Sequence, residues 1–219
     1  MNSAQIVLAG TSLIACPSGA LFWPDEGMLV ISDLHLGKSE RIARRGGALL
    51  PPYDTTETLT RLQSDIDVTL PSKVLCLGDN FDDLAASRSL DQTHRETLLR
   101  LQAGRKWYWV EGNHDPGPVD LGGTYLAELS LNGLVFRHIA KADEAVGEIS
   151  GHYHPKARLR ATRRPCFLTD GQRLIMPAYG AYTGGLDWTT PVLRGLLAEN
   201  ATAFLTGKKV LKVPVPRAA

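Results

Sequence analysis

Four short clusters of Asp, His and Asn residues constrain this chain more than any other feature of its sequence. They are Asp33-Leu34-His35, Gly78-Asp79-Asn80, Gly112-Asn113-His114-Asp115 and Gly151-His152-Tyr153-His154. Each cluster stands at the carboxyl end of an expected strand: three follow the apolar runs 28–31, 74–77 and 107–110, and the fourth follows Glu148-Ile149. Open α/β sheets place their ligand sites at the carboxyl ends of strands, so we expect all four clusters to meet in one site.

The apolar pattern between the clusters predicts alternating strands and helices. Three runs are typical of buried strands: 28–31, 73–77 and 107–110. The segment 54–66 carries a helical stripe, and Asp54 and Glu57 have the spacing of a capping box at its start. Strands that alternate with helices indicate a parallel sheet with helical crossovers.

The second half of the chain predicts short strands joined by tight turns. We expect these strands at 125–129, 134–138, 166–169, 174–176, 202–205 and 209–213. Thr190-Pro191 predicts the start of a helix through Leu197. No repeat or linker divides the chain, so we expect one domain over residues 1–219. The expected fold is α/β with α+β layering: a four-layer αββα sandwich of two mixed β-sheets flanked by helices.

Charge and cysteine content exclude several classes of protein. The 219 residues carry a formal net charge of +1, which argues against a protein that coats nucleic acid by bulk charge. Three cysteines without a close pair indicate neither a disulfide framework nor a zinc–cysteine site, and they fit a reducing cytoplasm. No stretch approaches the length of a membrane-spanning helix. We therefore expect a cytoplasmic protein with no membrane partner, and the oligomeric state stays open.

The polar clusters and one further histidine supply oxygen and imidazole donors without a thiolate. The candidate metal ligands are Asp33, His35, Asp79, Asn113, His138, His152 and His154. Seven donors exceed the four of a closed structural zinc site, and they suit two divalent ions that share a carboxylate. This donor mix favours manganese, and also iron or zinc, over calcium. Two metals can clamp both oxygens of an in-line displacement, so a phosphate ester is the natural substrate.

The order of these motifs resembles the calcineurin-like metallophosphoesterase superfamily from Asp33 to His154. The resemblance implies a first metal held by Asp33, His35, Asp79 and His154. It implies a second metal held by Asp79, Asn113, His138 and His152, with Asp79 as the bridge. It also implies that His114 faces the scissile phosphate and protonates the leaving group, and that Asp115 orients His114 by a hydrogen bond.

Longer stretches resemble the bacterial ligase-associated DNA damage response endonucleases. They are 32–38, 50–55, 152–156 and 180–186. That resemblance implies metal-dependent hydrolysis of a phosphodiester in DNA, with a repair role beside an ATP-dependent DNA ligase. In that family we expect a histidine where this chain has Asp82. The contacts of this side chain are therefore expected to differ from those in the family.

Several residues also have a simple structural interpretation. His138 stands alone at a strand end, where a histidine is often structural, but its place between two motifs favours a ligand. The basic residues Lys38, Arg41, Arg44 and Arg45 follow the first motif, and Lys156 and Arg158 follow the last. They could bind a DNA backbone, since phosphate contacts come largely from Lys and Arg. A solvated helix face explains the first group equally well.

Two other functions remain open at this point. A phosphomonoesterase or nucleotide phosphatase would use the same metal centre. A binding module that has lost catalysis would be expected to lack ligands or the proton donor. Here His114, Asp115 and all seven candidate ligands are present, so the binding module ranks third.

Overall fold

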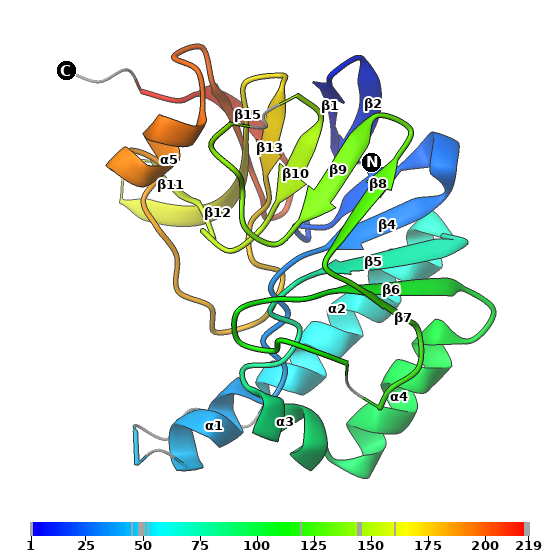
Figure 1. The fold of residues 1–219 in the computed structure, drawn as a ribbon. Coiled ribbons are helices and arrows are strands. Elements are labelled where there is room, and N and C mark those ends of the chain that lie inside the picture. Colours follow the sequence, from blue (N-terminus) through cyan, green and yellow to red (C-terminus); the bar gives the residue numbers. More distant parts are fainter. Residues whose placement is uncertain are drawn as a thin grey trace.

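Two β-sheets pack face to face in the middle of the molecule, with helices on their outer sides, in the computed structural model of the chain (Figure 1). The structure describes residues 2–44, 46–47, 51, 53–118, 120–143, 146–159 and 161–216. This arrangement confirms the predicted αββα sandwich of two mixed sheets.

The first sheet has seven strands that follow one another in chain order. They are β1 (Ala4–Leu8), β2 (Thr11–Ala15), β3 (Leu21–Trp23), β4 (Met28–Ile31), β5 (Lys73–Leu77), β6 (Lys106–Val110) and β7 (Thr124–Leu126). The pairs up to β4 are antiparallel, and β4 to β7 run parallel. Parallel neighbours need crossovers, and helices provide two of them. These helices are α1 (Lys38–Arg44) and α2 (Asp54–Thr69) before β5, and α3 (Leu84–Ser89) and α4 (Gln92–Gln102) before β6.

The second sheet has the order β15-β14-β12-β13-β10-β9-β8, and β11 pairs with β12 at its side. Its strands are β8 (Glu128–Leu131), β9 (Leu134–Arg137), β10 (Glu148–Ser150), β11 (Lys156–Leu159), β12 (Thr162–Thr169), β13 (Arg173–Ile175), β14 (Thr202–Leu205) and β15 (Leu211–Pro214). Among the described strands of this sheet, the parallel pairs are β9–β10 and β10–β13. Among the described residues of this half there is one helix, α5 (Pro191–Leu196), which begins where Thr190-Pro191 predicts it.

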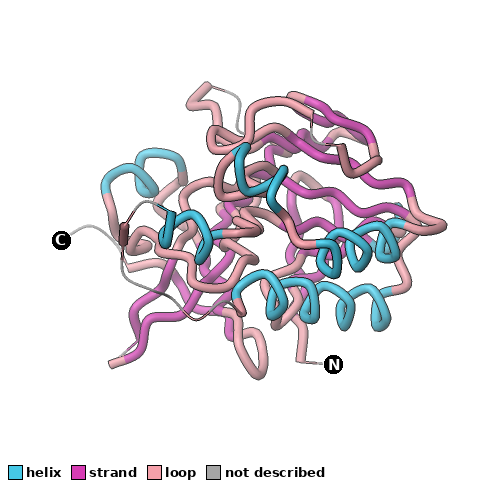
Figure 2. Tube along the Cα trace, turned by 90° about the horizontal axis from the view of Figure 1, so that it is seen from below, coloured by secondary structure: helices cyan, strands magenta, loops and turns pink. Residues whose placement is uncertain are grey.

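Alternation along the strands divides the core into layers. In β4, Leu29 packs toward α2 and α4, whereas Val30 packs toward the second sheet. Figure 2 shows α2 and α4 side by side on the outer face of the first sheet. A third cluster, with Trp188 and Leu193, fills the space between α5 and the second sheet. Buried strands with both faces covered explain the continuous apolar runs in the sequence.

Three local predictions differ from the structure. The predicted strand 125–129 is two strands, because the chain leaves the first sheet after β7 and enters the second at β8. Residues 5–23, for which the sequence pattern predicts one or two short strands, contain three strands, β1, β2 and β3. Asp54 does not cap α2 through its side chain: Tyr53 is the N-cap residue, and the Asp54 carboxylate accepts hydrogen bonds from Ser39 instead. No helix in the described part of the chain is long and apolar enough to cross a bilayer.

Candidate metal centre

The seven predicted ligands lie together where the loops after β4, β5, β6, β9 and β10 meet. Main-chain hydrogen bonds tie these loops to one another. Asp33 N donates to Gly78 O at 3.2 Å, and His35 N donates to Asp79 O at 2.9 Å. Gly151 N donates to His138 O at 3.0 Å. Hydrogen bonds between peptide groups at the ends of both sheets therefore position these side chains.

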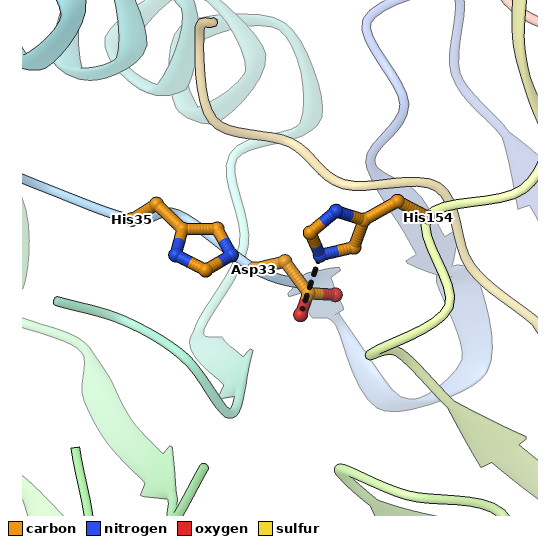
Figure 3. Close-up of side chains that lie close together, drawn as sticks. All are labelled: Asp33, His35 and His154. Atoms are coloured by element: carbon orange, nitrogen blue, oxygen red, sulfur yellow. Dashed lines mark ion pairs between the residues drawn. The ribbon is translucent and has the colours of Figure 1, made fainter. Parts of the chain in front are cut away.

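One group of donors consists of Asp33, His35 and His154. His154 Nε2 lies 3.1 Å from Asp33 Oδ1, and the two imidazole rings approach the carboxylate from two sides (Figure 3). Asp33 and His35 are buried, and His154 is half-buried. This group matches the first predicted metal site apart from the shared carboxylate.

A second group consists of Asp79, His138 and His152, with Asn113 beside them. His138 Nε2 lies 3.3 Å from Asp79 Oδ2, 3.0 Å from Asn113 Oδ1 and 3.3 Å from His152 Nδ1. Three other candidate metal-donor atoms thus surround one imidazole nitrogen of His138. This explains why the lone His138 groups with the residues of the motifs.

Asp79 connects the two groups. Its Oδ2 lies 3.3 Å from His138 Nε2 in the second group and 4.0 Å from His35 Nε2 in the first. Its Oδ1 accepts a hydrogen bond from the main-chain N–H of His114 at 2.9 Å, which fixes the carboxylate plane. This is the geometry that a bridging carboxylate needs.

The donor set fits divalent metal ions. The Nε2 atom of His35 is buried and has no hydrogen-bond partner among the described residues. An unpartnered buried nitrogen is costly unless something such as a metal ion accepts its lone pair. Imidazole, carboxylate and amide donors together suit transition metals.

Five of the seven ligands hold strained backbone conformations. Positive φ angles occur at Asp33 (53°), His35 (45°), Asp79 (45°), His152 (69°) and His154 (45°). A left-handed conformation costs a residue other than glycine roughly 1–2 kcal/mol. The main-chain hydrogen bonds between the loops hold these residues in place, and such concentrated strain is typical of functional sites.

The loop after β5 also depends on a glycine. Gly78 has φ 75°, and a Cβ atom at this position would overlap the ring of His138. Only a residue without a side chain lets the Asp79 loop approach the histidine so closely.

Burial and neighbouring charges set the protonation of the ligands. Burial opposes ionisation of Asp79, but the hydrogen bond and charge of His138 lower the pKa of this carboxyl to about 2. Burial works against protonation of His138, but Asp79 and Asp33 raise its pKa above the ordinary value. Burial and the charge of His138 lower the pKa of His152. Acid should therefore compete with metal first at His138, since a histidine must be neutral to coordinate.

His114 lies at the open side of this centre. Its side chain is 35% exposed, whereas that of Asp79 is 3% exposed, and His114 Nε2 lies 3.9 Å from Asp79 Oδ2. The other ring nitrogen, Nδ1, lies 3.0 Å from the main-chain carbonyl of Asp82. The imidazole is thus held at one nitrogen and accessible at the other.

The structure corrects the predicted contact between Asp115 and His114. Asp115 Oδ2 accepts hydrogen bonds from Asn80 N (2.9 Å), Asn80 Nδ2 (3.0 Å) and Phe81 N (3.2 Å). The carboxylate therefore fixes the loop that carries Asp79, and the Asp82 carbonyl contacts His114 instead. Asp115 acts on the centre through the backbone of residues 79–81.

We expect the Asp115 carboxyl of the metal-free protein to titrate near pH 6. Burial, and to a lesser degree the charge of Asp79, raise its pKa to about 6 despite the hydrogen bonds that it accepts. A carboxyl with a raised pKa adds stability below its ordinary pKa of 3.8, and this contribution is lost as pH rises through about 6. The carboxyl carbon shift in an NMR titration measures this directly. A midpoint below pH 4 would contradict the expected effect of burial.

Asp82 contacts the candidate centre, although it is not one of the predicted ligands. It is fully buried, and His35 Nδ1 lies 2.9 Å from its Oδ1. Lys38 Nζ lies 3.4 Å from the same oxygen, and Arg41 Nε pairs with Oδ2. Burial opposes ionisation, yet these three partners keep the pKa of Asp82 well below its usual range. A carboxylate behind a ligating histidine fixes the ring and increases its basicity.

The basic residues of α1 therefore have partners within the protein. Lys38 and Arg41 pair with Asp82, and Arg44 pairs with Asp83 at 3.0 Å. Arg45 lies outside the described residues. In this structure the cations of α1 neutralise acidic side chains near the site, which weakens the case for a DNA contact there.

The basic residues of β11 are arranged differently. Lys156 Nζ donates to the carbonyl of Thr183 at 2.8 Å, and Arg158 is exposed. Arg158 is paired across the strands with Arg163, so two like charges face the same side of the hairpin. Such an arrangement is unfavourable by itself, and the negative charge of Asp187, which interacts with both arginines, offsets part of the repulsion.

Fold and donor set together define a metal-dependent phosphoesterase of the αββα sandwich class. More particularly, the chain belongs to the calcineurin-like phosphoesterase family, whose model matches residues 28–170. Members of this family use divalent metal ions. The match confirms the predicted resemblance to the calcineurin-like metallophosphoesterases.

A solved structure shows the same fold over nearly the whole chain. The crystal structure of the nuclease MPE from Pseudomonas putida matches with a TM-score of 0.77 and 25% sequence identity. The match covers 96% of this chain and 100% of the nuclease chain. No curated protein matches the sequence at a significant level.

Proposed function

We propose that this protein is a phosphodiesterase, specifically an endonuclease that hydrolyses DNA with two divalent metal ions and an activated water. The position of Asp79 between two groups of imidazole donors carries the proposal. Manganese is the first candidate ion, with iron or zinc as alternatives.

The proposal assigns a role to each residue of the centre. Asp33, His35 and His154 would hold one ion, Asn113, His138 and His152 would hold the other, and Asp79 would serve both. When bound, the ions would neutralise phosphate charge and lower the pKa of an attacking water. His114 stabilises the phosphate and gives a proton to the leaving oxygen from its exposed nitrogen. The carbonyl of Asp82 holds the other nitrogen, and Asp115 fixes the loop.

The preference for a nucleic-acid diester rests on two supports. The Pseudomonas putida protein of the same fold is the nuclease MPE. The stretches that resemble ligase-associated DNA damage response endonucleases lie around the centre, at 32–38 and 152–156. From that resemblance we also propose a role in DNA repair beside an ATP-dependent DNA ligase, in the cytoplasm and as a single domain.

His114→Ala is expected to lower turnover about a hundredfold or more while metal content stays unchanged, because it removes a proton donor that is not a ligand. The assay uses protein stripped of metal and reloaded with manganese, on a chromogenic phosphodiester and the matching monoester. His94→Ala is the control, since His94 lies at the start of α4 and forms a hydrogen bond with Thr56 of α2.

Each outcome decides something about the proposal. Preference for the diester, lost in His114→Ala, supports the phosphodiesterase. Preference for the monoester assigns a phosphatase instead. Loss of bound metal in His114→Ala would show that this histidine is a ligand. Absence of turnover on both esters with metal bound would favour a binding module.

A further inference from the structure

A cavity of about 550 Å³ lies beside the metal centre, between the loop 178–183 and the start of β11. Its wall includes Lys156, Tyr182, Thr183 and Lys208, with Arg61 at another side. None of the seven ligands lines it, so it is a neighbour of the centre and not a part of it.

The loop that forms this wall is anchored on the segments that carry the ligands. Gly180 N donates to the carbonyl of Asp33 at 3.0 Å. At the other end, a Cβ atom on Gly185, which has φ 154°, would overlap the carbonyl oxygen of His154. The loop therefore starts and ends against two residues of the first metal group, which places the cavity beside the centre.

Tyr182 projects from this loop under strain. Its φ is 57°, which is unfavourable for a residue with a side chain, and its side chain is 41% exposed. Neighbouring contacts hold the loop: Ala181 N donates to Thr58 Oγ1 at 3.0 Å, and Lys156 Nζ donates to Thr183 O. A strained, exposed aromatic side chain on an ordered loop at a site indicates a recognition role.

The cations of this cavity differ from those of α1. Within the described residues, no carboxylate lies within ion-pair distance of Lys156 or Lys208. Arg61, in contrast, is neutralised by Glu57 at 2.8 Å. Lys156 is half-buried and has a carbonyl as its partner, and Lys208 is exposed at the mouth. These two ammonium groups have no carboxylate partner, and they lie beside an aromatic ring. Such a site is complementary to a ligand that carries both a phosphate and a base.

We propose that this cavity binds the nucleotide next to the scissile phosphate of an unpaired strand, with its base stacked on Tyr182 and its phosphate between Lys156 and Lys208. The inference rests on the proposed function and specifies its substrate: a single-stranded segment of nucleic acid. Stacking on an aromatic side chain needs an unpaired base face and tolerates any base.

The test measures binding of a short fluorescent single-stranded oligonucleotide to the metal-free protein by anisotropy. Tyr182→Ala is expected to weaken binding about tenfold, and Tyr182→Phe to keep it, because stacking needs only the ring. Lys208→Ala should weaken binding and reduce the slope of log K against log salt by about 0.7, the contribution of one phosphate contact on a single strand. Lys106→Ala is the control, since Lys106 is exposed at the opposite end of β6.

Unchanged affinity in both Tyr182→Ala and Lys208→Ala would overturn the inference, and so would equal dependence on Tyr182 for a blunt duplex. The chromogenic diester assay on the wild-type protein separates this result from failure of the proposed function. If the wild-type protein cleaves the diester and the variants bind normally, only the subsite is wrong. If the loaded protein cleaves no diester, the proposed function fails whatever the oligonucleotide shows.

Discussion

Asp79→Asn should abolish binding of at least one of two metal ions and lower kcat/KM on a phosphodiester by about a thousandfold. Asp79 lies between the two groups of imidazole donors, and its Oδ1 is fixed by the His114 N–H. An amide offers one weaker oxygen in place of two charged ones, so it cannot serve both ions. Loss of this contact removes several kcal/mol of charge stabilisation, which corresponds to this loss of rate.

Metal content per protein, measured by inductively coupled plasma mass spectrometry after reloading, checks this prediction. Asp67→Asn is the matched control, because Asp67 is an exposed residue of α2 that bonds to Gln63. Two ions retained by Asp79→Asn at wild-type affinity would refute the bridge. A retained fold, checked by circular dichroism, shows that the loss is local.

Asp82→Ala should lower the free energy of unfolding by about 3 kcal/mol. Removing one partner of a buried ion pair leaves the others uncompensated, which usually costs 3–5 kcal/mol. Lys38 and Arg41 are 16% and 19% exposed, so they can partly turn toward water, and the lower end of this range applies. Urea unfolding of the metal-free protein measures the change.

The milder variant Asp82→Asn separates stability from metal binding. It keeps the shape of the side chain but removes the charge behind His35 Nδ1, and metal affinity is expected to fall about tenfold or more. Asp67→Ala is the control for the stability measurement. Wild-type metal affinity in Asp82→Asn would show that Asp82 serves only to neutralise the basic side chains of α1.

The sequence could predict that the candidate ligands lie together, because the motifs encode both chemistry and place. A polar cluster after an apolar run lies at a strand end, and parallel strand ends meet at one edge. The roles of Asp82 and Asp115 could not be predicted, because they depend on which way two loops turn. Asp115 follows His114 directly, yet its carboxylate points to the 79–81 backbone.

In the fold, too, some elements could be predicted from the sequence pattern, whereas others depend on contacts between distant segments. Apolar runs located β4, β5 and β6, and Thr190-Pro191 located the start of α5, but the apolar pattern joined β7 and β8 into one strand. Both halves of 124–131 favour extended backbone, and only the partners on each side assign them to different sheets. The Asp54 capping box failed similarly, since Ser39 competes for the carboxylate.

The left-handed ligands at the strand ends also bear on how such a protein evolves. Each of these residues works against the fold: glycine or asparagine at Asp33, Asp79 or His152 would relax the backbone but remove a donor. Selection for stability alone therefore favours loss of the centre, and selection for activity must oppose it continually. Descendants released from catalysis should lose these positions first and become more robust, and the sandwich around them would then be free to acquire other uses.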